Sequence, residues 1–132
     1  MLKVLIGQMD KGRGAAAVVA TVLLLGLLLN SENAWAATFT VGDASGWKFN
    51  VDGWPEGKTF NSGDVLVFNY NPERHDVAVV DKQGYDACKA SEGATIFQSG
   101  SDQVTLVKGQ NYFICNFPGH CESKMKIAVN AL

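Results

Sequence analysis

The chain has 132 residues, a formal net charge of −2 and three cysteines. This length is enough for one domain with a modest core. The slightly acidic balance and the lack of any run of lysines and arginines argue against a nucleic-acid-binding protein.

The first 36 residues have the pattern of a secretory signal peptide. The apolar run Ala15 to Leu29 follows basic residues and has 15 residues, whereas a membrane-spanning helix needs about 20. The small-x-small sequence Ala34-Trp35-Ala36 then provides a cleavage site. We therefore expect residues 1–36 to be removed; an uncleaved membrane anchor is the alternative.

Cleavage leaves residues 37–132 as the mature domain, whether translation starts at Met1 or at Met9. This part keeps 8 basic and 11 acidic residues. It has no signal for a lipid anchor, so we expect a secreted protein without a membrane anchor. All three cysteines lie in this part, in an oxidising compartment. Their odd number leaves one thiol outside any intrachain disulfide.

Short β-like segments separated by turn signals follow one another along the mature chain. The predicted strands are Thr38–Gly42, Val65–Tyr70, Asp76–Val80, Gln103–Val107, Asn111–Cys115 and Lys126–Ala131. One short helix is predicted in the segment GYDACKAS around Cys88. The pattern predicts an all-β domain, an antiparallel sandwich or a small barrel. Its expected core includes the aromatic residues Trp47, Phe68, Phe97 and Phe113.

The segment CNFPGHCESKM places three potential metal ligands, Cys115, His120 and Met125, between two predicted strands. Pro118 and Gly119 favour a sharp turn in its middle. A loop that leaves one strand and enters the next can aim the three side chains at a common centre.

The neighbouring cysteine, Cys121, is expected to point away from that centre. Neighbours in an extended chain point to opposite sides, which makes Cys121 a better disulfide partner for Cys88 than Cys115 is. The pairings Cys115–Cys121 and Cys88–Cys115 remain alternatives, and each leaves a thiol without a role.

The donor types favour copper. A thiolate with a thioether is a soft set, whereas structural zinc sites use four Cys or His ligands and catalytic ones keep a water position. A blue copper site needs two imidazoles, one thiolate and a weak axial methionine. The second imidazole is available in His75, which lies between two predicted strands.

These features resemble the phytocyanins, plant secreted blue copper proteins, and among them the plantacyanin (basic blue protein) branch. The resemblance rests on TFTVGDASGW, GWPEGKTFNSGDVLVFNYNPERHDVAVVD, GYDACKA and GQNYFICNFPGHCESKMKIAV, which cover nearly all of the mature chain. It implies a cupredoxin-like Greek-key β-sandwich with one or two short helices. It also implies a Cys88–Cys121 disulfide and one copper ion, Cu(I) or Cu(II), with four ligands: His75, Cys115, His120 and Met125.

Further residues are expected to support the site. The backbone N–H of Asn116 could donate to the Cys115 sulfur, and Asp76 could tie the two ligand loops together. Because loops lie at the surface, we expect electrons to pass through the edge of His120. We call His120, Phe117 and Pro118 the exit patch.

The resulting functional prediction is a monomeric one-electron carrier of the apoplast or cell wall, not an enzyme. Its partner would be an unidentified redox protein or a small-molecule reductant or oxidant. The main alternative is an extracellular signalling or cell-wall interaction protein in which copper is structural or incidental. A hydrolase using Cys115 is disfavoured, because no orienting residue or oxyanion motif accompanies the thiol.

Overall fold

The structure, a computed structural model, describes residues 35–132. The predicted signal peptide, apart from its last two residues, lies outside the described part of the chain. Residues Ala36–Leu132 form one unit. None of the helices in the described part has the length and apolar character that crossing a membrane requires.

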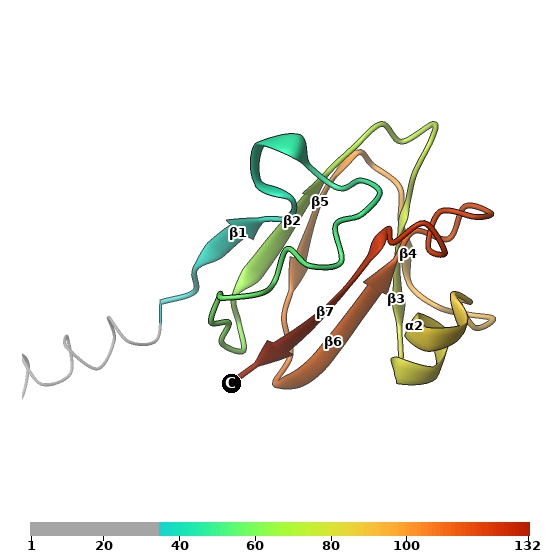
Figure 1. Cartoon of the computed structure of the whole chain (residues 1–132). Helices are drawn as coiled ribbons and strands as arrows, with labels where there is room; N and C mark the ends of the chain where they lie inside the picture. Colours follow the sequence, from blue (N-terminus) through green and yellow to red (C-terminus); the bar gives the residue numbers. More distant parts are fainter. Residues whose placement is uncertain (1–34) are drawn as a thin grey trace, which may run out of the picture. The chain divides into compact units, whose positions relative to one another are not determined.

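Strands of the described residues form two sheets, which pack face to face (Figure 1). One sheet has the order β1-β2-β5 and the other has the order β4-β3-β6-β7. The strands are β1 (Thr38–Thr40), β2 (Val65–Asn69), β3 (Val77–Val80), β4 (Ile96–Phe97), β5 (Ser101–Thr105), β6 (Gly109–Ile114) and β7 (Lys126–Ala131). The helical segments are the 3-10 turn η1 (Asp43–Ser45) and the helix α2 (Lys82–Ala87). The predicted all-β sandwich with short helices is confirmed.

One strand pair differs from the antiparallel arrangement that the sequence predicts. β1 and β2 pair in parallel, with Thr38 opposite Val65. A parallel pair needs a long crossover, and residues 41–64 provide it. The chain leaves β1 at Gly42, which has φ +77°, and a Cβ there would lie 1.9 Å from the Gly46 carbonyl oxygen. Glycine is therefore required at this turn.

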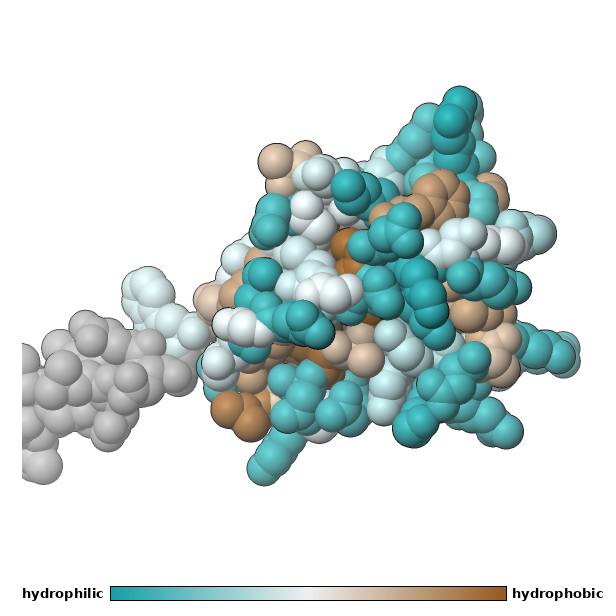
Figure 2. Space-filling view, in the orientation of Figure 1, coloured by the Kyte–Doolittle hydropathy of each residue, from teal (hydrophilic) through white to brown (hydrophobic). Residues whose placement is uncertain are grey.

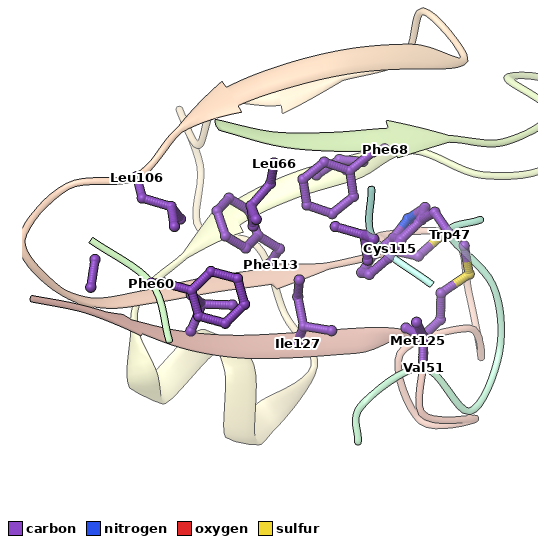
Figure 3. Close-up of a cluster of buried hydrophobic side chains, with 14 residues drawn as sticks. Trp47, Val51, Phe60, Leu66, Phe68, Leu106, Phe113, Cys115, Met125 and Ile127 are labelled. Carbon is purple, nitrogen blue, oxygen red and sulfur yellow. The ribbon is translucent and has the colours of Figure 1, made fainter. Parts of the chain in front are cut away.

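The main core lies between the two sheets (Figure 3). The Trp47 ring meets the Phe68 ring edge-on at 5.0 Å, and Phe68 lies 5.3 Å from Phe113. These three rings are fully buried, as expected, whereas Phe97 is only partly buried against the core. Because side chains alternate along β6, Phe113 and Cys115 both face this interior.

The opposite face of the β4-β3-β6-β7 sheet is covered by α2. The helix begins earlier than predicted because the Asp81 side chain caps it, accepting a 2.8 Å hydrogen bond from the Gly84 N–H. It ends at Cys88, which has φ +54°. A disulfide joins Cys88 to Cys121 in this outer cluster, which confirms the predicted pairing. The bridge fastens the loop after β6 to the helix.

Candidate metal centre

The predicted ligand residues come from segments that meet at one end of the sandwich (Figure 1). His75 lies in the loop before β3, and Cys115 directly follows β6. His120 and Met125 belong to the loop between β6 and β7. Since β3 and β6 are neighbours in one sheet, their adjacent ends bring the His75 loop beside Cys115.

Three donor atoms converge at this end. The Nδ1 atoms of His75 and His120 lie 3.1 Å apart. The Cys115 sulfur lies 3.9 Å from the first and 3.4 Å from the second. The cysteine is fully buried and is the only free one in the described part of the chain, while both histidines are partly exposed.

These separations fit a shared metal ion. Donors about 2.0 Å (nitrogen) and 2.3 Å (sulfur) from one ion lie roughly 3 to 4 Å from each other. One thiol with two imidazoles suits copper better than magnesium or calcium, which prefer oxygen ligands. A second group, Cys88, Cys121 and Glu122, is also closely spaced, but its sulfurs are joined in the disulfide.

Met125 is positioned by the backbone of the same loop. Its carbonyl accepts a 3.0 Å hydrogen bond from the Cys115 N–H, and its own N–H donates to the His120 carbonyl at 3.1 Å. The side chain is fully buried. Figure 3 shows it beside Trp47 at the same end of the core as Cys115.

Asp76 connects the two ligand-bearing loops. Its buried carboxylate accepts a hydrogen bond of 2.6 Å from the backbone N–H of Asn116. From the sequence, we expected this N–H to donate to the Cys115 sulfur. In the structure it donates to the Asp76 carboxylate instead, because a carboxylate oxygen is a stronger hydrogen-bond acceptor than sulfur. The Asp76 carbonyl also accepts from the Trp47 indole N–H at 2.8 Å, a contact that no sequence pattern predicts.

The surroundings perturb two of the donor groups. Burial raises the pKa of the Cys115 thiol, as does the charge of Asp76, while the backbone N–H groups of Asp76 and Phe117 act in the opposite direction. Burial also lowers the pKa of His75, with further lowering by His120 and Arg74. At neutral pH the metal-free site therefore holds a thiol and a neutral His75 imidazole, so that metal binding must displace the thiol proton.

Aromatic side chains surround the two imidazoles at the surface. Phe49 packs edge-on against His75 and His120, with ring centroids 5.6 and 4.8 Å apart. Phe117 stacks on His120 at 5.6 Å. With Glu73 and Arg74, these residues line a depression of about 390 Å³ over the site. Phe117 and His120 were predicted at the surface; Phe49 was missed.

Phe49 reaches the site through backbone pairing between distant loops. The next residues, Asn50 and Val51, donate their N–H groups to the carbonyls of Ser123 and Lys124 at 3.2 and 3.1 Å. No motif or periodicity in the sequence marks this pairing. The only sequence signal is an aromatic residue in a short segment that also holds two tryptophans.

Comparison with known proteins agrees with this fold and donor set. A family model described as a plastocyanin-like domain matches residues 45–125. Basic blue protein of Arabidopsis thaliana is 55% identical over 129 residues, covering 94% of this chain and all of the relative. Chemocyanin of Lilium longiflorum is 52% identical, covering 93% of this chain and 99% of the relative.

A solved structure gives the same result. Cucumber basic protein, a blue copper protein, is 57% identical and superposes with a TM-score of 0.72, covering 73% of this chain and all of that one. The two-sheet sandwich with one thiol and two imidazoles at its end thus defines a cupredoxin-like protein. The chain belongs to the phytocyanin family.

Proposed function

We propose that this protein is a secreted one-electron carrier that holds one copper ion through His75, Cys115, His120 and Met125. The observation that carries the proposal is the buried free thiol, which lies within 4 Å of two imidazole nitrogens in a phytocyanin fold. Bound copper would supply a Cu(I)/Cu(II) couple that exchanges one electron at a time.

The chain itself would hold these donors in one arrangement. Cys115 sits on the rigid inner face of a strand end, and its N–H is bonded to the Met125 carbonyl. Asp76 ties the His75 loop to Asn116. The disulfide at Cys121 restrains the loop directly after His120. Fixed donor positions in both oxidation states keep the reorganisation cost low, which favours rapid electron transfer.

The fourth ligand role, that of Met125, rests on its burial and on its position beside Cys115. A thioether is a weak, soft axial ligand that favours Cu(I). Four protein donors would also leave no open position for a substrate, which is why we propose a carrier rather than an enzyme.

Electrons would enter and leave through the exit patch. Of its members, His120 and Phe117 are half-buried and Pro118 is exposed. They surround the route to the metal with mostly apolar surface, which suits brief docking. On the face shown in Figure 2 hydrophilic residues predominate, with small separate hydrophobic areas, as expected for a protein that meets partners transiently.

The predicted signal peptide indicates where the protein acts. We propose that residues 1–36 direct secretion and are removed, and that residues 37–132 act in the apoplast or cell wall. The redox partner would be an extracellular protein or a small-molecule reductant or oxidant.

A redox titration tests this function. We expect the protein to bind one copper ion per chain. We expect the oxidised, copper-loaded form to be reduced fully and reversibly by one electron equivalent. A requirement for two equivalents, or turnover of the reductant with oxygen at an enzymatic rate, would contradict the proposal.

A further inference from the structure

A second polar site lies outside the metal centre, around the carboxylate of Asp64. This side chain is only 3% exposed. One oxygen accepts a 2.8 Å hydrogen bond from the Asn61 N–H, and the other accepts a 2.9 Å hydrogen bond from the Ala37 N–H. Within residues 35–132, no lysine, arginine or histidine forms an ion pair with it. A buried carboxylate without a cation is costly.

Ala37, the residue whose N–H donates to this carboxylate, begins the hydrogen bonding of β1 to the rest of the sandwich. The Ala37 carbonyl accepts a 2.9 Å hydrogen bond from the Val65 N–H, which begins the parallel pairing of β1 with β2. The preceding residues, Trp35 and Ala36, are exposed, and Trp35 is 80% exposed. Ala37 is itself exposed, but its hydrogen bonds to the sandwich begin directly after the predicted cleavage point.

We propose that cleavage after Ala36 creates the missing cation, because the new α-ammonium group of Ala37 forms an ion pair with Asp64. Hydrolysis of the Ala36–Ala37 peptide bond adds one water molecule. The carboxylate leaves with the leader, and the amino group on Ala37 takes up a proton at neutral pH. This inference rests on the proposed signal peptide and goes beyond the proposed electron transfer.

The ion pair would fasten several parts of the sandwich to the mature amino terminus. The Asp64 side chain caps the turn that begins at Asn61, and its backbone carbonyl accepts from the Leu106 N–H at 2.8 Å. In the unprocessed chain, Ala37 offers this carboxylate a neutral amide N–H. Processing therefore replaces a hydrogen bond from a neutral donor by one between two ionised groups, which adds the attraction of opposite charges, and the mature domain is the more stable form.

The α-amino group itself gives the most direct test. The protein starting at Ala37 is produced by removing a fusion tag with a protease that leaves no added residue. Its copper-loaded, reduced form, labelled with ¹³C-alanine, is titrated by NMR. The pKa of a free α-amino group is about 7.7–8.0. With Asp64 present, we expect the pKa of the Ala37 α-amino group to be higher by about one unit, which makes the ammonium a tenfold weaker acid. In the Asp64→Asn variant, we expect this pKa to lie in the range of a free α-amino group. An unshifted pKa with Asp64 intact overturns the ion pair.

Stability gives a second readout that does not depend on the Asp64 variant folding well. Acetylation of Ala37 removes the charge but keeps an N–H donor and leaves Asp64 intact. We expect the acetylated protein to melt at a lower temperature at pH 7. An ammonium group whose pKa is raised by folding stabilises the protein fully below about pH 7.7, and this stabilisation is lost as the pH rises through the raised pKa. The difference in melting temperature between the free and acetylated proteins should therefore shrink above about pH 9. Equal melting temperatures at pH 7 contradict the proposal.

A matched control separates this effect from the general loss of a buried carboxylate. Asp102 is 7% exposed and bonds to Tyr70 and Ser99. Asp102→Asn should therefore leave the difference between the free and acetylated forms unchanged, whereas Asp64→Asn should abolish it. Mass spectrometry of the secreted protein tests the cleavage position independently. A different first residue overturns the processing step, whereas an unshifted pKa in the Ala37 form overturns the ion pair alone.

Discussion

The carboxylate of Asp76 accepts a hydrogen bond from the backbone N–H of Asn116 across two loops that are 40 positions apart in the sequence. Each residue follows a proposed copper ligand, His75 and Cys115. The bond therefore fixes the distance between the first imidazole and the thiol. This hydrogen bond thereby holds the two ligand-bearing loops in place before any metal binds.

Removing this hydrogen bond should lower the stability of the protein. Asp76→Ala should lower the free energy of unfolding of the copper-free protein by about 1.5–3 kcal/mol, because a hydrogen bond to a charged group is lost. Asp76→Asn keeps an acceptor oxygen and should lose less. Urea unfolding measures both. Glu73→Ala, an exposed residue of the same loop, is the control and should change stability by less than about 0.5 kcal/mol. Equal losses in the alanine variants would refute the bridging role.

The disulfide should stabilise the fold without contributing to the metal site. It lies in the outer cluster, whereas Cys115 faces the interior. The double variant Cys88→Ala, Cys121→Ala should lose about 2–4 kcal/mol of unfolding free energy while retaining the visible copper spectrum at low temperature. Loss of the spectrum in a variant that circular dichroism shows to be folded would mean that the bridge is needed to form the site.

Met125 should set the reduction potential. Met125→Gln should lower it, because a harder amide oxygen favours Cu(II). Met125→Leu, which removes the axial donor but keeps an apolar side chain of similar size, should raise it. Protein-film voltammetry of both variants gives the two shifts. Shifts of the same sign, or no shift, would show that Met125 does not act as the axial ligand.

The exit patch should govern exchange with small redox reagents. Phe117→Asp places a negative charge over His120, so exchange should become faster with a cationic reagent and slower with an anionic one, while a neutral reagent is little affected. Stopped-flow kinetics measures the rates. Val107→Asp is the matched control, since Val107 is exposed near the start of β6, whereas Cys115 follows its end. If both variants respond equally, electrons do not pass through the patch.

Copper uptake should depend on pH in a defined direction. Burial raises the Cys115 pKa and lowers the His75 pKa. Above the His75 pKa and below the Cys115 pKa, binding releases one proton, from the thiol. The apparent affinity should thus rise about tenfold per pH unit between about pH 7 and pH 8. Competition with a chelator of known pH dependence measures it, and a flat profile would mean that the thiolate exists before copper binds.

Much of this site could be predicted from the sequence because its donors are few. Three of the four proposed ligands lie in one segment, and His75 is the only other histidine in the chain. Alternation along β6 then places Cys115 inside. The Phe49 contact could not be predicted, because it depends on backbone pairing of Asn50 and Val51 with a distant loop.

The fold shows a similar division. Most of the strands could be predicted from local sequence patterns, because their apolar residues alternate. The parallel pairing of β1 with β2 depends on the path of residues 41–64, which carries no periodic signal. The short strand β4, Ile96–Phe97, was also missed, because two residues are too few to show alternation.

The visible spectrum of the oxidised, copper-loaded protein tests the central claim most directly. An intense Cu(II)–thiolate band at one copper per chain is expected, and Cys115→Ser should abolish it, because a hydroxyl cannot replace the thiolate. Circular dichroism must show that the variant is folded, and Cys115→Ala provides a second test. A colourless protein with copper bound, or a band that persists in folded Cys115→Ser, would contradict a copper centre built on this thiol.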